Sequence, residues 1–301
     1  MSVKYEEIVN VHDIGNKNVR KLNELLSLAG NVKGIPASED KEKVFLLCID
    51  FQNDFMENGE LGVPNSHKDV ENVTRFIHTH LNKITKIGVS LDTHTPEQIF
   101  HPFWWVDAEG RHPAPFTIIT YSDVLDGKWL PRKEKEKSLE YVQNLEKIGK
   151  KQLCIWPYHC IKGTFGASLE GQLANIVYFH SLVRQTEVKT VIKGESPVTE
   201  MYGIFKPEYD PNYELDVQLL EEITSYDKIF VAGEAKSHCV LESLYQMLDY
   251  MSKKGRETSQ VYVLEDCMSS IPGFENETEE AYQRLADTYH IQLVKSTEVE
   301  L

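Results

Sequence analysis

Val44-Phe-Leu-Leu-Cys-Ile49 is an unbroken apolar run that stops at Asp50, and this stretch decides the fold. A short apolar run without polar alternation is typical of a strand buried on both faces of a parallel sheet. Because parallel strands end at a common edge, residues that follow such runs are expected to meet there. Three more β-like runs lead to chemically useful residues: 84–91 to Asp92, 188–192 to Lys193, and 228–232 through a short loop to Cys239.

The segments between these runs have helical periodicity, so strands and helices alternate along the chain. Six strands that alternate with helices predict an α/β protein, a three-layer α/β/α sandwich around a mostly parallel six-stranded sheet. Further strands are predicted at 261–264 and 291–294, and helices near 70–81, 168–184, 214–225, 237–251 and 277–288.

The composition is that of a globular protein, with 41% hydrophobic residues in a chain of 301. The net charge of −15 disfavours a nucleic-acid partner, because phosphate binding depends on clustered Lys and Arg. No leader-like start and no apolar run of about 18 residues is present, so we expect no membrane partner and a cytoplasmic location. The five cysteines lack Cys-x-x-Cys spacing, which favours reduced thiols over disulfides.

Two segments lie outside the alternating pattern. Residues 1–40 are polar with one helical patch, and we interpret them as an N-terminal helical arm on a single domain, 41–301. Residues 102–153 are interpreted as an insertion within that domain. Their charged part carries apolar residues on one face, which predicts a solvated amphipathic helix. The sequence assigns no function to either segment.

Cys239 is the candidate nucleophile, because it follows a strand-like run and begins a helical pattern. The partial positive charge at a helix N-terminus lowers the pKa of a thiol, and the N–H groups there can hold an oxyanion. A free cysteine is often simply buried, so a structural thiol is the alternative interpretation.

Asp50 and Lys193 are candidates for the groups that activate this thiol. A carboxylate at the end of a buried strand is unfavourable unless it is paired or functional, so Asp50 is predicted to be a general base with a raised pKa. Lys193 would place an ammonium group beside Asp50 and Cys239. Asp54, four residues after Asp50, is explained equally well by a turn or capping role and by a direct one.

Asp92-Thr-His94 is half of a candidate metal site, because the i, i+2 spacing lets both side chains point to one side of an extended backbone. His159 is the candidate third ligand, with His101 as a further one. One carboxylate and two imidazoles fit a catalytic divalent metal, with zinc preferred over iron or manganese. No glycine-rich phosphate-binding signature follows a strand, so a dinucleotide cofactor is not predicted.

Five short motifs follow one another along the chain: Asp50-Phe-Gln-Asn-Asp-Phe55, Asp92-Thr-His94, Trp156-Pro-Tyr-His-Cys-Ile-Lys-Gly-Thr-Phe-Gly-Ala167, Ile192-Lys-Gly194 and Ser237-His-Cys239. In these motifs and their order the chain resembles the nicotinamidase branch of the isochorismatase-like cysteine hydrolases, over about residues 44–295. The resemblance implies a six-stranded parallel sheet, an Asp50–Lys193–Cys239 triad and a metal held by Asp92, His94 and His159. It also implies a cis peptide at Glu234–Ala235 and an oxyanion hole made by the N–H groups of Ala235 and Cys239.

On these grounds we expect an enzyme, a metal-assisted cysteine amidohydrolase that converts nicotinamide and water to nicotinate and ammonia through a thioester on Cys239. Its partner would be a small-molecule amide, and a homo-oligomer is expected. Phe55, Trp156 and Tyr202 are the candidate pocket walls, although core packing explains such aromatics equally well. Two alternatives remain open: a related hydrolase of another amide, a carbamoyl or ureido compound or an isochorismate-like substrate, and a non-catalytic binding protein.

Overall fold

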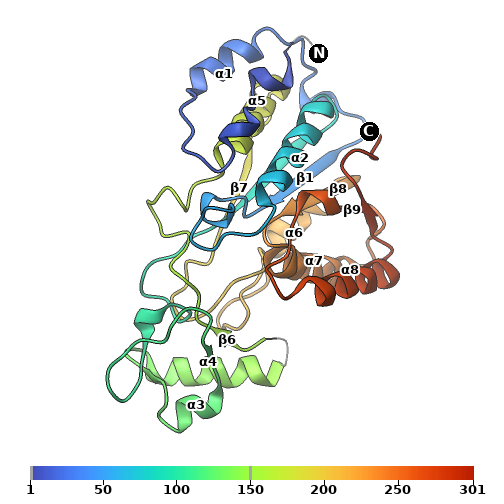
Figure 1. The fold of residues 1–301 in the computed structure, drawn as a ribbon. Coiled ribbons are helices and arrows are strands. Elements are labelled where there is room, and N and C mark those ends of the chain that lie inside the picture. The colour runs from blue at the N-terminus through green and yellow to red at the C-terminus, as the bar shows by residue number, and fades with distance from the viewer. Residues whose placement is uncertain (1–2, 149–150) are drawn as a thin grey trace.

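A parallel six-stranded sheet forms the centre of the computed structural model, which describes residues 3–148 and 151–301 (Figure 1). The strand order is β10-β9-β8-β1-β2-β7, and every pairing between neighbours is parallel. The predicted six-stranded sheet is confirmed. Its strands are β1 (Val44–Ile49), β2 (Lys86–Asp92), β7 (Lys189–Lys193), β8 (Lys228–Gly233), β9 (Val261–Leu264) and β10 (Gln292–Val294).

Helices cover both faces of this sheet, because successive side chains of a strand point to opposite sides. Leu46 of β1 belongs to one apolar core and Leu47 to the other. Helices α1, α2 and α5 close the first core, and α6, α7 and α8 close the second. This arrangement is the predicted α/β/α sandwich. The bounds are α1 (Leu22–Ala29), α2 (Ser66–Thr79), α5 (Gly171–Arg184), α6 (Val217–Ile223), α7 (Leu241–Lys253) and α8 (Glu275–Tyr289).

The N-terminal segment packs onto the body of the fold. Tyr5 and Ile8 are buried in the first core, and the Tyr5 hydroxyl shares a 2.8 Å hydrogen bond with the Thr74 hydroxyl of α2. Helix α1 lies against α5 (Figure 1). Residues 1–40 therefore cover part of one helical layer, and their treatment as a separate unit stays a prediction.

The segment predicted to be an insertion forms a lobe with its own apolar core, centred on Trp104, Trp105 and Tyr141 (Figure 1). The helix expected in its charged stretch is α4 (Lys135–Ile148). No helix within the described ranges has the length and apolar character needed to cross a bilayer. The other elements of the lobe are β3 (Trp105–Val106), β4 (Ile118–Ile119), α3 (Tyr121–Leu125), β5 (Leu130–Pro131) and β6 (Leu153–Cys154).

Candidate active site

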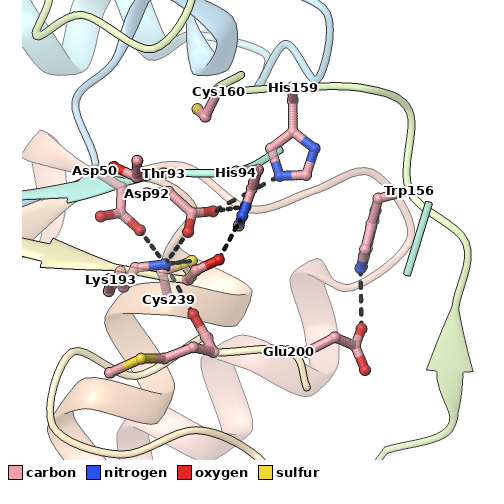
Figure 2. A network of polar contacts seen from close by, with 12 residues as sticks. Asp50, Asp92, Thr93, His94, Trp156, His159, Cys160, Lys193, Glu200 and Cys239 are labelled. Atoms are coloured by element: carbon pink, nitrogen blue, oxygen red, sulfur yellow. Dashed lines mark hydrogen bonds and ion pairs between the residues drawn. The ribbon is translucent and has the colours of Figure 1, made fainter. Parts of the chain in front are cut away.

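Four strand-end residues meet at the carboxyl edge of the sheet, with Lys193 at their centre (Figure 2). The Lys193 Nζ atom lies 2.9 Å from Asp50 Oδ2, 3.0 Å from Asp92 Oδ1 and 3.7 Å from Cys239 Sγ. Strands β8, β1, β2 and β7 are neighbours in the sheet, and each leads to one of these residues. The structure thus brings together all four side chains that the strand-end pattern singled out.

Asp50 has a fixed orientation at the end of β1. Its Oδ1 accepts a 2.6 Å hydrogen bond from Ser90 Oγ, and the Asp50 N–H donates to the same hydroxyl oxygen at 3.0 Å. Burial raises the pKa of this carboxyl, against the opposing effect of the Lys193 charge. A raised pKa makes a carboxylate a better proton acceptor, as the predicted general base requires.

Lys193 is charged although its side chain is completely buried. Burial lowers the pKa of an ammonium group, but the negative charges of Asp50 and Asp92 outweigh this effect and hold the pKa well above its usual value. The ammonium group also donates to the Met201 carbonyl oxygen at 2.9 Å. Lys193 therefore links the carboxylate beside the thiol to the carboxylate of the candidate metal site.

Cys239 lies in a π-helical turn, Lys236–Val240, that continues into α7. The residue is 6% exposed, and burial raises the pKa of its thiol well above the usual value despite the nearby Lys193 charge. The prediction of a lowered thiol pKa is wrong, because the loss of hydration outweighs the favourable charges. The thiolate must therefore form by proton transfer to a neighbour, and the nearest candidate is Asp50, whose carboxylate contacts the same Lys193 ammonium group as the thiol.

Asp92, His94 and His159 form a buried group of potential metal ligands whose ligand atoms lie within 4.8 Å of one another. The Nδ1 atom of His94 lies 3.0 Å from the Gly194 carbonyl oxygen, and that of His159 lies 2.8 Å from the Pro157 carbonyl oxygen. Since a carbonyl can only accept, both Nδ1 atoms carry the proton and leave Nε2 available as a ligand. This set of donors fits a divalent metal.

Gly194 makes room for this group. Its φ of +77° lies in the region that favours glycine, and a Cβ atom there would come within 2.5 Å of Asp92 Oδ1 and 2.6 Å of His94 Cε1. A side chain at this position would displace two candidate metal ligands at once.

His101 lies beside the close group but outside it. Its ring centre is 5.9 Å from that of His94 and 6.1 Å from that of His159. Burial lowers its pKa to about 3, and its Nε2 atom has no hydrogen-bond partner among the described residues. A neutral imidazole with a free lone pair remains a candidate for an additional ligand.

Hydrogen bonds to the backbone of Cys160 hold the preceding residue, His159, close to His94. The Asp54 carboxylate accepts a 2.6 Å hydrogen bond from the Cys160 N–H, and the His94 N–H donates to the Cys160 carbonyl oxygen at 3.0 Å. The Gln52 side chain fixes the backbone of Asp92: its Nε2 donates to the Asp92 carbonyl oxygen and its Oε1 accepts from the Asp92 N–H, both at 2.7 Å. Asp54 therefore has a structural role, but through a contact between distant segments and not through the turn or cap considered from the sequence.

A narrow cleft opens onto Cys239. Its walls include all three predicted aromatics, Phe55, Trp156 and Tyr202. His238, which precedes the cysteine, also lines the cleft and makes edge contacts with Trp156 and Tyr202. The candidate nucleophile and the candidate metal ligands thus share one partly aromatic pocket.

Comparison with known proteins agrees with this geometry, although no protein-family model matches the chain. The chain is 24% identical to the nicotinamidase of Saccharomyces cerevisiae over 196 residues, which is 65% of this chain and 76% of the relative. It is 26% identical to the nicotinamidase of Escherichia coli over 199 residues, which is 65% of this chain and 71% of the relative. The yeast nicotinamidase structure with the inhibitor nicotinaldehyde has a TM-score of 0.58 at 20% identity, covering 84% of this chain and 99% of that one. These matches support a shared family and a shared fold.

The chain is similar in sequence to nicotinamidases and shares their fold. The Glu234–Ala235 peptide is cis, as the resemblance implied. Ala235 and Cys239 both line the cleft, on either side of the first residues of the π-helical turn. Their assignment as the oxyanion hole stays a prediction.

Glu200 is a pocket residue that the sequence did not single out. Its Oε1 accepts hydrogen bonds from Tyr202 OH at 2.6 Å and Trp156 Nε1 at 3.2 Å, and its Oε2 accepts one from Tyr141 OH at 2.9 Å. Burial raises its pKa. Tyr141 belongs to α4, so the inserted lobe supports the pocket wall through this carboxyl. Glu200 lies in an irregular segment, where no periodic pattern marks it.

Proposed function

We propose that this protein is a metal-assisted cysteine amidohydrolase and that its substrate is nicotinamide. One observation carries the proposal: a single buried ammonium, that of Lys193, contacts the thiol of Cys239 and the carboxylates of Asp50 and Asp92. The nucleophile and the candidate metal ligands line one cleft, and the proton acceptor lies against the ammonium group that contacts the thiol and Asp92. The similarity to two nicotinamidases supports nicotinamide as the substrate among the possible amides.

The side chains supply each proton transfer of the reaction. Asp50 takes the thiol proton, and the Cys239 sulfur adds to the amide carbon while the N–H groups of Ala235 and Cys239 hold the oxyanion. Asp50 then gives its proton to the departing ammonia, which breaks the carbon–nitrogen bond and leaves a thioester. A water molecule that transfers a proton to Asp50 attacks the thioester carbon, releases the acid and restores the thiol.

Asp92, His94 and His159 would hold the divalent cation, for which zinc is the preferred candidate and iron or manganese are alternatives. A cation bound there supplies a Lewis acid that can orient a ring nitrogen or a water molecule in the cleft. Phe55, Trp156 and Tyr202 would enclose the ring, which keeps the amide carbon near Cys239. The predicted homo-oligomer and cytoplasmic location stay predictions.

Removal of the metal is expected to lower the kcat/KM for nicotinamide at least about tenfold, with recovery when zinc, iron or manganese is returned. Ammonia release and metal content are measured on the same sample before and after chelation. Benzamide, which lacks the ring nitrogen, serves as the matched control substrate and should be cleaved less efficiently. Cleavage of a carbamoyl or ureido compound but not of nicotinamide would favour the rival hydrolase, and turnover of none of these would favour a binding protein.

Tyr141→Phe is expected to raise the KM for nicotinamide about three- to tenfold with a smaller change in kcat, because the buried Glu200 carboxyl loses a donor and holds Trp156 and Tyr202 less firmly. Steady-state kinetics give the two constants. Tyr209→Phe is the control, since the Tyr209 hydroxyl donates to the exposed Glu140 of α4, the helix that also carries Tyr141. A fall in kcat at unchanged KM would contradict a role in the pocket wall.

A further inference from the structure

Two buried carboxyl groups lie behind the segment that leads to Cys239. Glu234 follows β8 and has no exposed surface, while Asp69 lies in the first turn of α2 and is 4% exposed. One oxygen of each carboxyl, Asp69 Oδ2 and Glu234 Oε1, is buried and has no donor among the described residues, and the two side chains are close enough for each to act on the pKa of the other. Neither residue belongs to the triad or to the candidate metal ligands, and the reaction described above does not use them.

The surroundings of this pair are acidic or neutral. The charged groups that act most on Asp69, besides Glu234, are Asp266 and Glu57, and both are acids. Cys267 also faces Asp69, and burial keeps its thiol neutral by raising the pKa well above the usual value. The Lys236 ammonium, two residues beyond Glu234, lies 2.5 Å from Glu279 of α8.

Two adjacent carboxyl groups in such a site cannot both be ionised, because burial and mutual repulsion act in the same direction. Burial raises the pKa of Asp69 to about 6 and that of Glu234 well above its usual value. Asp69 is the better anion, since it lies in the first turn of a helix and the Ser269 side chain favours its charged form. Glu234 is then the acid that keeps its proton.

Glu234 also controls the backbone beside the nucleophile. It directly precedes Ala235, and its Oε2 accepts a hydrogen bond from the Ser269 N–H at 3.4 Å. The Lys236 N–H donates to the Ser269 carbonyl oxygen at 2.8 Å. The Ser237 hydroxyl accepts from the Ile271 N–H at 3.1 Å. The segment from Glu234 to the nucleophile is thus fixed against the Ser269 loop, and the carboxyl pair is its innermost attachment.

We infer that Glu234 and Asp69 share one proton, that Glu234 carries it, and that the resulting hydrogen bond positions the Ala235 segment beside Cys239. Glu234 is a positioning residue in this account and makes no contact with the substrate. The positioning part rests on the proposed amide hydrolysis, whereas the shared proton does not. At alkaline pH the pair loses this proton, the two carboxylates repel each other, and the attachment weakens.

Glu234→Gln tests both parts, because an amide keeps the donated hydrogen bond and cannot ionise. Groups whose pKa is raised by folding stabilise the protein at low pH, and this contribution is lost as the pH rises through the raised values. Relative to wild type, the variant should therefore gain about 2 °C or more in Tm at pH 9 and little or nothing at pH 5. The kcat/KM of both proteins should fall between pH 7 and pH 10, and the fall should be about tenfold or more smaller in the variant than in wild type.

Asp69→Asn removes the other carboxyl of the pair and should give the same gain in Tm at alkaline pH. The double variant should gain no more in Tm than either single variant. Glu279→Gln, an acid 60% exposed near the same segment, is the control and should show no such gain. If neither Glu234→Gln nor Asp69→Asn gains Tm at alkaline pH, the shared proton is refuted. A Tm gain without any change in the alkaline limb of kcat/KM would overturn positioning. A wild-type protein inactive on nicotinamide would count against the proposed function and leave the Tm result intact.

Discussion

Cys239→Ala should abolish ammonia release from nicotinamide, with a loss in kcat/KM of about ten-thousandfold or more. The substitution removes the sulfur that would form the thioester, and nothing else in the cleft replaces it. Cys160 is the nearest alternative thiol in sequence to the metal ligands, but it is completely buried and does not line the cleft. The residual rate would come from binding and from the oxyanion-stabilising N–H groups alone.

Cys154→Ala is the matched control, since it removes a partly buried thiol from β6 and should leave kcat/KM unchanged. Intact-protein mass measurement during turnover should show an acyl group on the wild type and on Cys154→Ala but not on Cys239→Ala. Burial raises the pKa of the Cys239 thiol, so little of it is thiolate, the form that reacts with an alkylating agent. Alkylation of Cys239 should therefore be slow unless Asp50 takes the thiol proton. Wild-type turnover by Cys239→Ala would refute the assigned nucleophile.

The strand ends were predictable because two simple patterns coincide. An uninterrupted apolar run such as Val44–Ile49 must be buried on both faces, and a parallel sheet sends all such runs to one edge. The position of Asp50, Asp92, Lys193 and Cys239 at neighbouring strand ends follows from these two rules. The spacing of Asp92 and His94 likewise follows from extended backbone, and the structure has their ligand atoms close together.

What the sequence could not supply is the packing around these residues. The direction of the Cys239 pKa depends on how completely other segments exclude water, and the local pattern showed only the favourable helix N-terminus. Glu200 escaped notice because its partners come from distant segments, with Tyr141 59 positions away. Glu234 was named only as one residue of the implied cis peptide, and nothing in the chain pointed to Asp69 as its partner. Contacts between segments that lack periodicity have no sequence signal of their own.

Lys193→Met should lower the free energy of unfolding by about 3–5 kcal/mol and abolish turnover. The side chain is completely buried between two carboxylates, at 2.9 Å from Asp50 and 3.0 Å from Asp92. A methionine of similar length fills the space but leaves both charges uncompensated. Lys189→Met on the same strand is the control: its ammonium is 32% exposed beside Glu222, and its loss should change the free energy of unfolding by no more than about 1 kcal/mol.

A second substitution separates the structural and the chemical roles of this lysine. Asp50→Asn added to Lys193→Met removes one of the two unpaired charges, so part of the lost stability should return in chemical denaturation, while ammonia release stays absent because the proton acceptor is gone. Recovery of stability without activity would show that the fold tolerates the loss of the ion pair and the chemistry does not. Full activity in Lys193→Met would instead mean that the buried ammonium serves packing alone, and the charge-linked triad would have to be abandoned.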